Sequence, residues 1–168
     1  MVKKDTYEAL LNIFFDNPSK GFHLRELARM VHISHPAVKI YLDEIKKCDI
    51  LIRTASHTYQ ASRSPSYSQS RRINILQRLQ GLGLVSYLVK ELTPRAIILF
   101  GSASRGEDVE QSDIDLFIDC PKRDLELHRY EKGLHRKINI TFGDIKRLNK
   151  EFLNSVINGV ILYGGIEL

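Results

Sequence analysis

Residues 97–119 read IILFGSASRGEDVEQSDIDLFID, and this stretch decides the fold of the second half of the chain. Its first four residues, Ile97 to Phe100, are apolar and predict a buried strand. The Gly101-Ser102 pair ends this strand and begins a short helix, which ends at Gly106. After a polar loop, the segment from Asp113 to Ile118 begins with alternating acidic and apolar side chains. This alternation predicts a second strand.

Two acidic side chains lie on one face of this second strand, because side chains alternate with a period of two. Asp113 and Asp115 therefore offer oxygen ligands of the kind that Mg²⁺ takes together with substrate phosphates. Ser102 precedes Asp113 by eleven residues. The Gly101-Ser102 turn can offer backbone N–H groups and a hydroxyl to those phosphates. Arg105 is placed either to meet a phosphate or to solvate the surface.

A strand, a Gly-Ser turn and an Asp-x-Asp strand in this order resemble the DNA polymerase β-like nucleotidyltransferase superfamily, and most closely its minimal nucleotidyltransferase branch. The resemblance covers Pro94 to Gly165. It implies an α/β fold with a small mixed sheet, and Mg²⁺ and a nucleoside triphosphate as cofactor and substrate. It also implies specific roles: Asp113 and Asp115 would be the catalytic and metal-binding residues, and Gly101, Ser102 and Arg105 would contact the nucleotide.

The resemblance fails at one position. In this superfamily a third carboxylate, on a neighbouring strand, helps to hold a second metal ion and to activate the nucleophile. In the minimal branch it lies within an apolar-acid-apolar triplet, and the matching triplet here is Ile138-Asn139-Ile140. An amide can coordinate through its carbonyl oxygen, but it carries no charge and cannot act as a base.

Other acids are poor replacements for the missing carboxylate. Asp119 lies four residues beyond Asp115, which is about 13 Å along a strand. Asp144 is expected to cap a helix over residues 145–155. A loop that we expect to be mobile contains Glu107, Asp108 and Glu110. We therefore expect the protein to bind Mg²⁺ and nucleotide rather than to transfer a nucleotide efficiently.

The first 66 residues predict three helices followed by a hairpin. The helices are expected over residues 5–16, Leu24–Met30 and His35–Cys48, with Pro36 in the first turn of the third. The order of these elements and the fragment LRELARMVHISHPAVKIYLDEIKKCDIL resemble the winged helix-turn-helix fold of bacterial and archaeal transcription regulators. The resemblance implies that the third helix enters the major groove of double-stranded DNA.

The residues expected at DNA fall into two groups. Side chains at the start of the third helix would contact base edges, namely His35, Pro36 and Lys39. Basic side chains around it would contact phosphates, namely Arg25, Lys46, Lys47 and Arg53. The alternative is a helical interaction module that does not touch DNA.

Charge is distributed unevenly along the chain. Residues 1–92 contain fourteen Lys and Arg against eight Asp and Glu, and residues 93–168 contain eleven against twelve. The net charge of +5 thus comes from the first part, which favours a nucleic-acid partner there. No run of eighteen apolar residues exists, so no membrane partner is expected. Cys48 and Cys120 lack metal-ligand spacing and are expected to be reduced and buried in a cytoplasmic protein.

Two further segments connect the parts. Residues 62–72, SRSPSYSQSRR, have the composition of a linker. A helix is expected from Ile73 to Leu92, with Gly81 and Gly83 marking a bend. Its apolar residues form more than one stripe, so we expect it to pack on the sheet and on a second subunit, which makes the protein a homodimer.

The predicted organisation is two domains: a winged helix-turn-helix over residues 1–66, and a linker helix with a nucleotidyltransferase-like α/β domain over residues 67–168. The first functional hypothesis is a DNA-binding transcriptional regulator whose second domain senses a nucleotide. The second is an active nucleotidyltransferase that modifies a protein or a small molecule, as antitoxin-like members of the family do. The third is a non-catalytic module for a protein partner. Asn139 favours the first hypothesis over the second, and the basic first half favours it over the third.

Overall fold

The structure is a computed structural model that describes residues 3–110 and 112–167. The chain divides into two compact units, Met1–Arg71 and Arg72–Leu168. In these described residues, no helix has both the length and the apolar character needed to cross a membrane.

The first unit contains the three helices and the hairpin that the sequence predicts. The helices are α1 (Lys4–Asp16), α2 (Leu24–Met30) and α3 (His35–Lys47), and the hairpin pairs β1 (Leu51–Arg53) with β2 (Tyr59–Ala61) in antiparallel register. A proline is favourable in the first turn of α3, because the backbone N–H that it lacks would have no partner within the helix. Two lysines in the last turn are favourable because the helix dipole is negative at that end.

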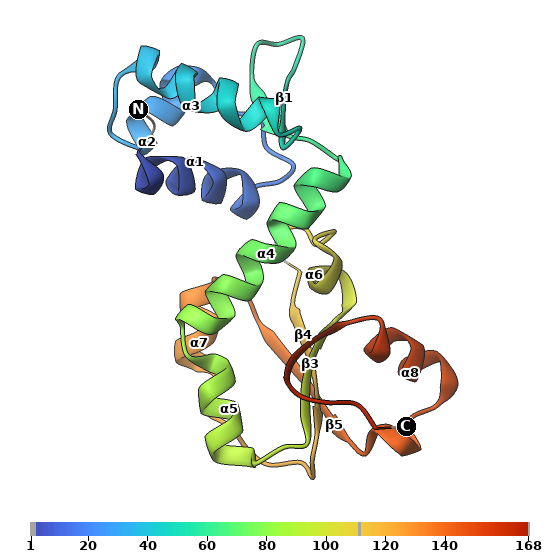
Figure 1. Ribbon diagram of the computed structural model, residues 1–168. Helices are drawn as coiled ribbons and strands as arrows, with labels where there is room; N and C mark the ends of the chain where they lie inside the picture. The colour runs from blue at the N-terminus through green and yellow to red at the C-terminus, as the bar shows by residue number, and fades with distance from the viewer. Residues whose placement is uncertain (1–2, 111, 168) are drawn as a thin grey trace. The chain divides into compact units, whose positions relative to one another are not determined.

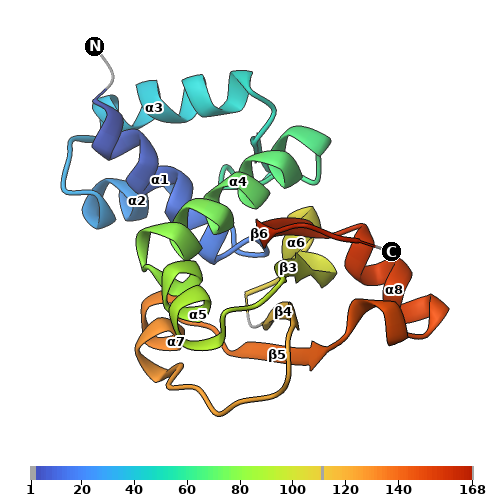
Figure 2. The same ribbon diagram turned by 60° about the horizontal axis from the view of Figure 1, so that its bottom comes forward.

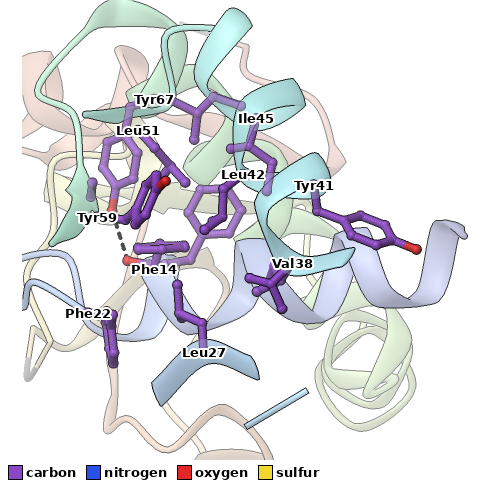
Figure 3. Packing of buried hydrophobic residues seen from close by; sticks show 14 of the residues in the cluster. Phe14, Phe22, Leu27, Val38, Tyr41, Leu42, Ile45, Leu51, Tyr59 and Tyr67 are labelled. Atoms are coloured by element: carbon purple, nitrogen blue, oxygen red, sulfur yellow. Dashed lines mark hydrogen bonds between the residues drawn. The ribbon is translucent and has the colours of Figure 1, made fainter. Parts of the chain in front are cut away.

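A single apolar cluster holds the first unit together (Figure 3). Phe14 of α1 and Phe22 meet edge to face, with ring centroids 5.6 Å apart. The backbone of Phe22 also exchanges two hydrogen bonds of 2.8 Å with Tyr59, which ties the segment before α2 to the hairpin. From α3 the cluster receives the residues at helical spacing: Val38, Tyr41, Leu42 and Ile45.

The prediction of a linker over residues 62–72 is wrong, because α4 (Pro65–Gly81) begins inside it. Ser64 accepts a hydrogen bond from the Tyr67 N–H at 3.1 Å and so caps the first turn. Tyr67 and Arg71 lie one turn apart and are both buried. The Tyr67 hydroxyl donates to the carbonyl of Phe14, and the Arg71 guanidinium donates to the carbonyl of Phe15. This serine-rich stretch therefore completes the core of the first unit.

The second unit is a small mixed sheet covered by helices on both faces. Its strands are β3 (Ala96–Phe100), β4 (Ile114–Asp119), β5 (Ile138–Gly143) and β6 (Val160–Gly164), in the order β5-β4-β3-β6. The β4–β5 pair is parallel, and β3 is antiparallel to both β4 and β6. One face carries α5 (Leu84–Leu92) and α7 (His128–Leu134), and the other carries α8 (Lys150–Ile157), as Figure 1 and Figure 2 show.

The central strands are apolar on both faces because both faces are covered. Ile97 and Leu99 pack with Leu116 under α5 and α7. Ile98 and Phe117 pack with Val156 of α8 on the other face. This double burial explains the continuous apolar run of β3, since a strand with one solvated face would alternate.

Three sequence expectations need correction. The helix expected from Ile73 to Leu92 is broken, because α4 ends at Gly81 and Gly83 adopts a left-handed φ of +72° before α5. Asp144 caps only a short 3₁₀ turn, η1 (Ile145–Arg147), and Asn149 then caps α8. Cys48 is exposed rather than buried, since it follows the last turn of α3.

Burial within α3 gives a direct test of the first unit. The side chain of Leu42 is 0% exposed and that of Ile40, on the same helix, is 59% exposed. We expect Leu42→Ala to lower the free energy of unfolding by about 2–5 kcal/mol, because it leaves a cavity in the core. The matched variant Ile40→Ala should change it by less than about 0.5 kcal/mol. Urea unfolding followed by circular dichroism measures both, and equal effects would contradict the packing.

Candidate nucleotide-binding site

The turn after β3 needs a glycine at position 101 for two reasons. Gly101 begins the helix α6 (Gly101–Arg105) with a φ of +72°, a conformation that side chains disfavour. A Cβ atom there would also lie only 2.6 Å from Oδ2 of Asp115. The absence of a side chain therefore lets the turn and this carboxylate lie against each other.

Sheet register brings the predicted site residues together. Asp115 is opposite Phe100 in the antiparallel pair of β4 with β3, so it lies beside the residue that precedes Gly101. In the parallel pair of β4 with β5, Asp115 is opposite Asn139. The residue that the superfamily pattern assigns to the third acid thus lies beside the Asp-x-Asp strand.

The Asn139 amide bridges the two carboxylates. Its Nδ2 donates to Oδ2 of Asp113 at 2.9 Å and to Oδ1 of Asp115 at 3.3 Å. Both carboxylates therefore converge on one point, which the positive end of the amide dipole occupies. Rotation of the amide would present its carbonyl oxygen at the same place, so two carboxylates and one neutral oxygen form a donor set suited to one hard divalent cation.

The other two residues predicted to contact the nucleotide follow Gly101 in α6. Ser102 is half-buried in α6. Arg105 is exposed, and its Nη1 donates to the carbonyl of Gly101 at 3.0 Å while its Nε donates to Oε2 of Glu107 at 2.6 Å. The guanidinium thus lies at the turn, in a solvent-exposed ion pair.

Sequence reasoning missed Arg136, which fixes the segment that leads into β4. Its Nη1 pairs with Oδ2 of Asp108 at 2.6 Å, and the two side chains are only 9% and 2% exposed. The same guanidinium donates to the carbonyls of Ser112 at 2.5 Å and Asp113 at 3.1 Å. Asp108 is therefore a buried structural residue and not an acid on a mobile loop that could reach the site. Nothing in the spacing of the two residues along the chain indicates this pair.

Asp119 and Asp144 also lie away from the Asp113 and Asp115 pair. Asp119 is opposite Gly143 at the other end of β4. Asp144 accepts from the Lys146 N–H at 3.0 Å and lies 3.7 Å from Arg147 Nε. Among the residues that the structure describes, no group of three or more His, Cys, Asp or Glu side chains is arranged to hold a metal ion.

The residues predicted to contact DNA are all exposed on the first unit. They are Arg25 on α2, His35, Pro36, Lys39, Lys46 and Lys47 on α3, and Arg53 on β1. Lys47 also pairs with Glu44 at 2.7 Å. A cavity of about 810 Å³ lies at the turn between α2 and α3, with Arg29, His32 and His35 among its lining.

A mixed sheet with a Gly-Ser turn packed against an Asp-x-Asp strand defines a nucleotidyltransferase-type domain. The chain belongs to the polymerase beta nucleotidyltransferase family, because the family model described as "Polymerase beta, Nucleotidyltransferase" matches residues 83–166, half of its length. Searches of curated proteins and of solved structures gave no match.

The buried ion pair predicts a large difference between two arginines. Arg136→Met should lower the free energy of unfolding of the second unit by about 3–5 kcal/mol, because it leaves the Asp108 carboxylate buried without its cation. Arg105→Met removes an exposed ion pair and one exposed hydrogen bond to the Gly101 carbonyl, and should change stability little. Thermal unfolding of both variants makes the comparison, and an Arg136→Met variant as stable as wild type would contradict the structural role given to this pair.

Proposed function

We propose that the protein is a DNA-binding transcriptional regulator whose second unit binds Mg²⁺ and a nucleoside triphosphate but transfers the nucleotide slowly or not at all. The observation that carries the second half of the proposal is the Asn139 amide, which hydrogen-bonds both Asp113 and Asp115 where the superfamily pattern has an acid.

Binding of one cation is supported by the convergence of the two carboxylates. Asp113 and Asp115 would hold the ion, with the Asn139 carbonyl oxygen as a neutral third ligand. Such an ion organises the phosphates of a bound triphosphate. The Ser102 hydroxyl and the Arg105 guanidinium, both beside the Gly101 turn, would then hold the phosphates.

Slow nucleotide transfer is supported by the missing negative charge at position 139, where an amide stands in place of a carboxylate. In two-ion chemistry the second ion lowers the pKa of the attacking hydroxyl, and carboxylates hold that ion. With Asn139 in place of an acid, the site has two negative charges for two divalent cations. The amide also cannot accept a proton from the acceptor hydroxyl.

Asn139→Asp and Asp113→Ala test the metal site from opposite directions. We expect wild type to bind a nucleoside triphosphate only with Mg²⁺. Asp113→Ala should abolish this metal-dependent binding, because one of two charged ligands is gone. Asn139→Asp should strengthen Mg²⁺ binding by about tenfold or more, since a carboxylate replaces a neutral ligand. Calorimetry with Mg²⁺ and each nucleoside triphosphate, together with a transfer assay using labelled nucleotides, measures both properties.

Two results would contradict the proposal. Equal nucleotide affinity in wild type and Asp113→Ala would mean that the acidic pair is not a metal site. Fast transfer by wild type, unchanged in Asn139→Asp, would favour an active nucleotidyltransferase that modifies a protein or a small molecule.

For the first unit we propose a winged helix-turn-helix that binds double-stranded DNA. The support is the sequence of three helices and an antiparallel hairpin, together with the exposure of the basic candidates on α2, α3 and β1. His35, Pro36 and Lys39 would meet base edges, and Arg25, Lys46, Lys47 and Arg53 would meet phosphates. The proposal includes a homodimer, because one unit of this size covers little DNA.

Removal of the base-contacting side chains should weaken specific DNA binding. We expect His35→Ala and Lys39→Ala each to lower the affinity for the preferred sequence by about 1–3 kcal/mol. Binding should also fall steeply with salt, because phosphate contacts release counterions. The measurement is selection of preferred sequences from a random duplex library, followed by fluorescence anisotropy at several salt concentrations.

Lys4→Ala is the matched control, since Lys4 is an exposed lysine of α1 that pairs with Glu8. Its effect should be small. A full-length protein that binds no duplex at low salt would contradict the DNA-binding half of the proposal and favour a protein-interaction module. A monomeric mass by light scattering, at tens of micromolar protein, would contradict the dimer.

A further inference from the structure

A second cavity lies at the opposite end of β4 from the acidic pair. Its volume is about 380 Å³, and Arg95, Asp119, Lys122 and Phe142 are among its lining residues. Register separates it from the first site, because Asp115 is opposite Asn139 whereas Asp119 is opposite Gly143, four positions further along both strands. The volume lies within the range of about 300–1,000 Å³ that is usual for small-molecule sites.

Asp119 is the unusual group in this cavity. The residue is only 5% exposed, and within the described part of the chain its carboxylate has no hydrogen-bond or ion-pair partner. No described side-chain nitrogen or oxygen is both fully buried and unpaired. The oxygens of the Asp119 carboxylate must therefore be slightly exposed. Because Asp119 lines the cavity, we take this exposure to be toward the cavity. Buried charges in proteins are normally paired, so this carboxylate is an acceptor without its donor.

The cavity lining carries more positive than negative charge: its cationic residues are Arg95, Lys122 and Arg147, and its one acid besides Asp119 is Asp144, which lies 3.7 Å from Arg147. Arg95 and Lys122 are exposed and cationic, and the Arg95 N–H donates to the Asp119 carbonyl at 3.0 Å, which keeps the two residues together. Phe142, near the end of β5, packs toward the core under α5 and α7, so its ring lies on the other face of the sheet from Asp119. Burial raises the pKa of the adjacent Cys120 thiol above its usual range, so the thiol adds no negative charge at neutral pH.

We propose that this cavity is a second ligand site, and that its ligand is a guanine mononucleotide bound without metal. A carboxylate that lacks donors is matched by two adjacent N–H groups, which the Watson–Crick edge of guanine presents to a single acceptor group. Adenine presents one donor and one acceptor on that edge, and its ring nitrogen would face the carboxylate. The phosphate of the nucleotide would lie against Arg95 and Lys122.

The test measures guanosine monophosphate binding to the full chain by calorimetry. The buffer contains EDTA, which removes Mg²⁺ and so prevents nucleotide binding at the proposed Mg²⁺-dependent site. We expect it to bind at least tenfold more tightly than adenosine monophosphate or guanosine. Asp119→Asn should weaken its binding at least tenfold, because the amide replaces one acceptor with a donor. Lys122→Ala should weaken the nucleotide but leave guanosine unchanged.

Matched controls separate this site from its neighbours. Asp124→Asn and Lys132→Ala make the same chemical changes at exposed positions outside the cavity lining and should leave binding unchanged. Asp113→Ala should also leave it unchanged, so failure of this proposal is distinct from failure of the metal site. The melting temperature of Asp119→Asn should be at least that of wild type, since an unpaired buried charge is removed.

Three results would overturn the proposal. The first is equal affinity for guanosine and adenosine monophosphates, or guanosine monophosphate affinity that is unchanged in Asp119→Asn and in Lys122→Ala. The second is a large fall in melting temperature in Asp119→Asn, which would make Asp119 a structural residue. The third is tighter binding of free arginine, whose guanidinium and carboxylate offer the same two features, because it would assign the cavity to an amino acid.

Discussion

The position of β4 is the constraint on which the second unit depends. This strand lies between an antiparallel neighbour, β3, and a parallel neighbour, β5, and its middle is buried on both faces. Polar side chains can therefore stand only at its two ends. Asp113 and Asp115 occupy one end and Asp119 the other, so the fold itself separates the acids into two locations that cannot act together.

The first of these ends is organised by neutral groups rather than by opposite charges. Gly101 admits the Asp115 carboxylate by having no side chain, and Asn139 satisfies both carboxylates through one amide. The nearly buried cation Arg136 pairs instead with Asp108 and with the backbone that leads into the strand. Arg136 therefore does not neutralise the charge of Asp113 and Asp115. It instead holds the backbone before β4 through hydrogen bonds to the carbonyls of Ser112 and Asp113.

Local sequence patterns predicted the strands around the site. They could not predict side-chain interactions between residues that lie far apart in the sequence. The apolar run from Ile97 to Phe100 predicted β3, and the alternation after Asp113 predicted β4. Both predictions were possible because the burial of each strand residue is visible in the local sequence pattern. The pair of Arg136 with Asp108 could not be predicted, since no spacing rule links residues 28 positions apart. The serines of residues 62–72 misled in another way. Their composition is that of a linker, but Ser64 is a helix cap, and tertiary packing of Tyr67 and Arg71 outweighs low helix propensity.

The burial of Tyr67 and Arg71 determines where the chain can be divided. A fragment that ends at residue 66, where composition changes, would lose both side chains from the core of the first unit. The carbonyls of Phe14 and Phe15 would then face the gap without these donors. Because an unpaired buried carbonyl destabilises a small domain, proteolytic or recombinant fragments of the first unit should retain at least the first two turns of α4.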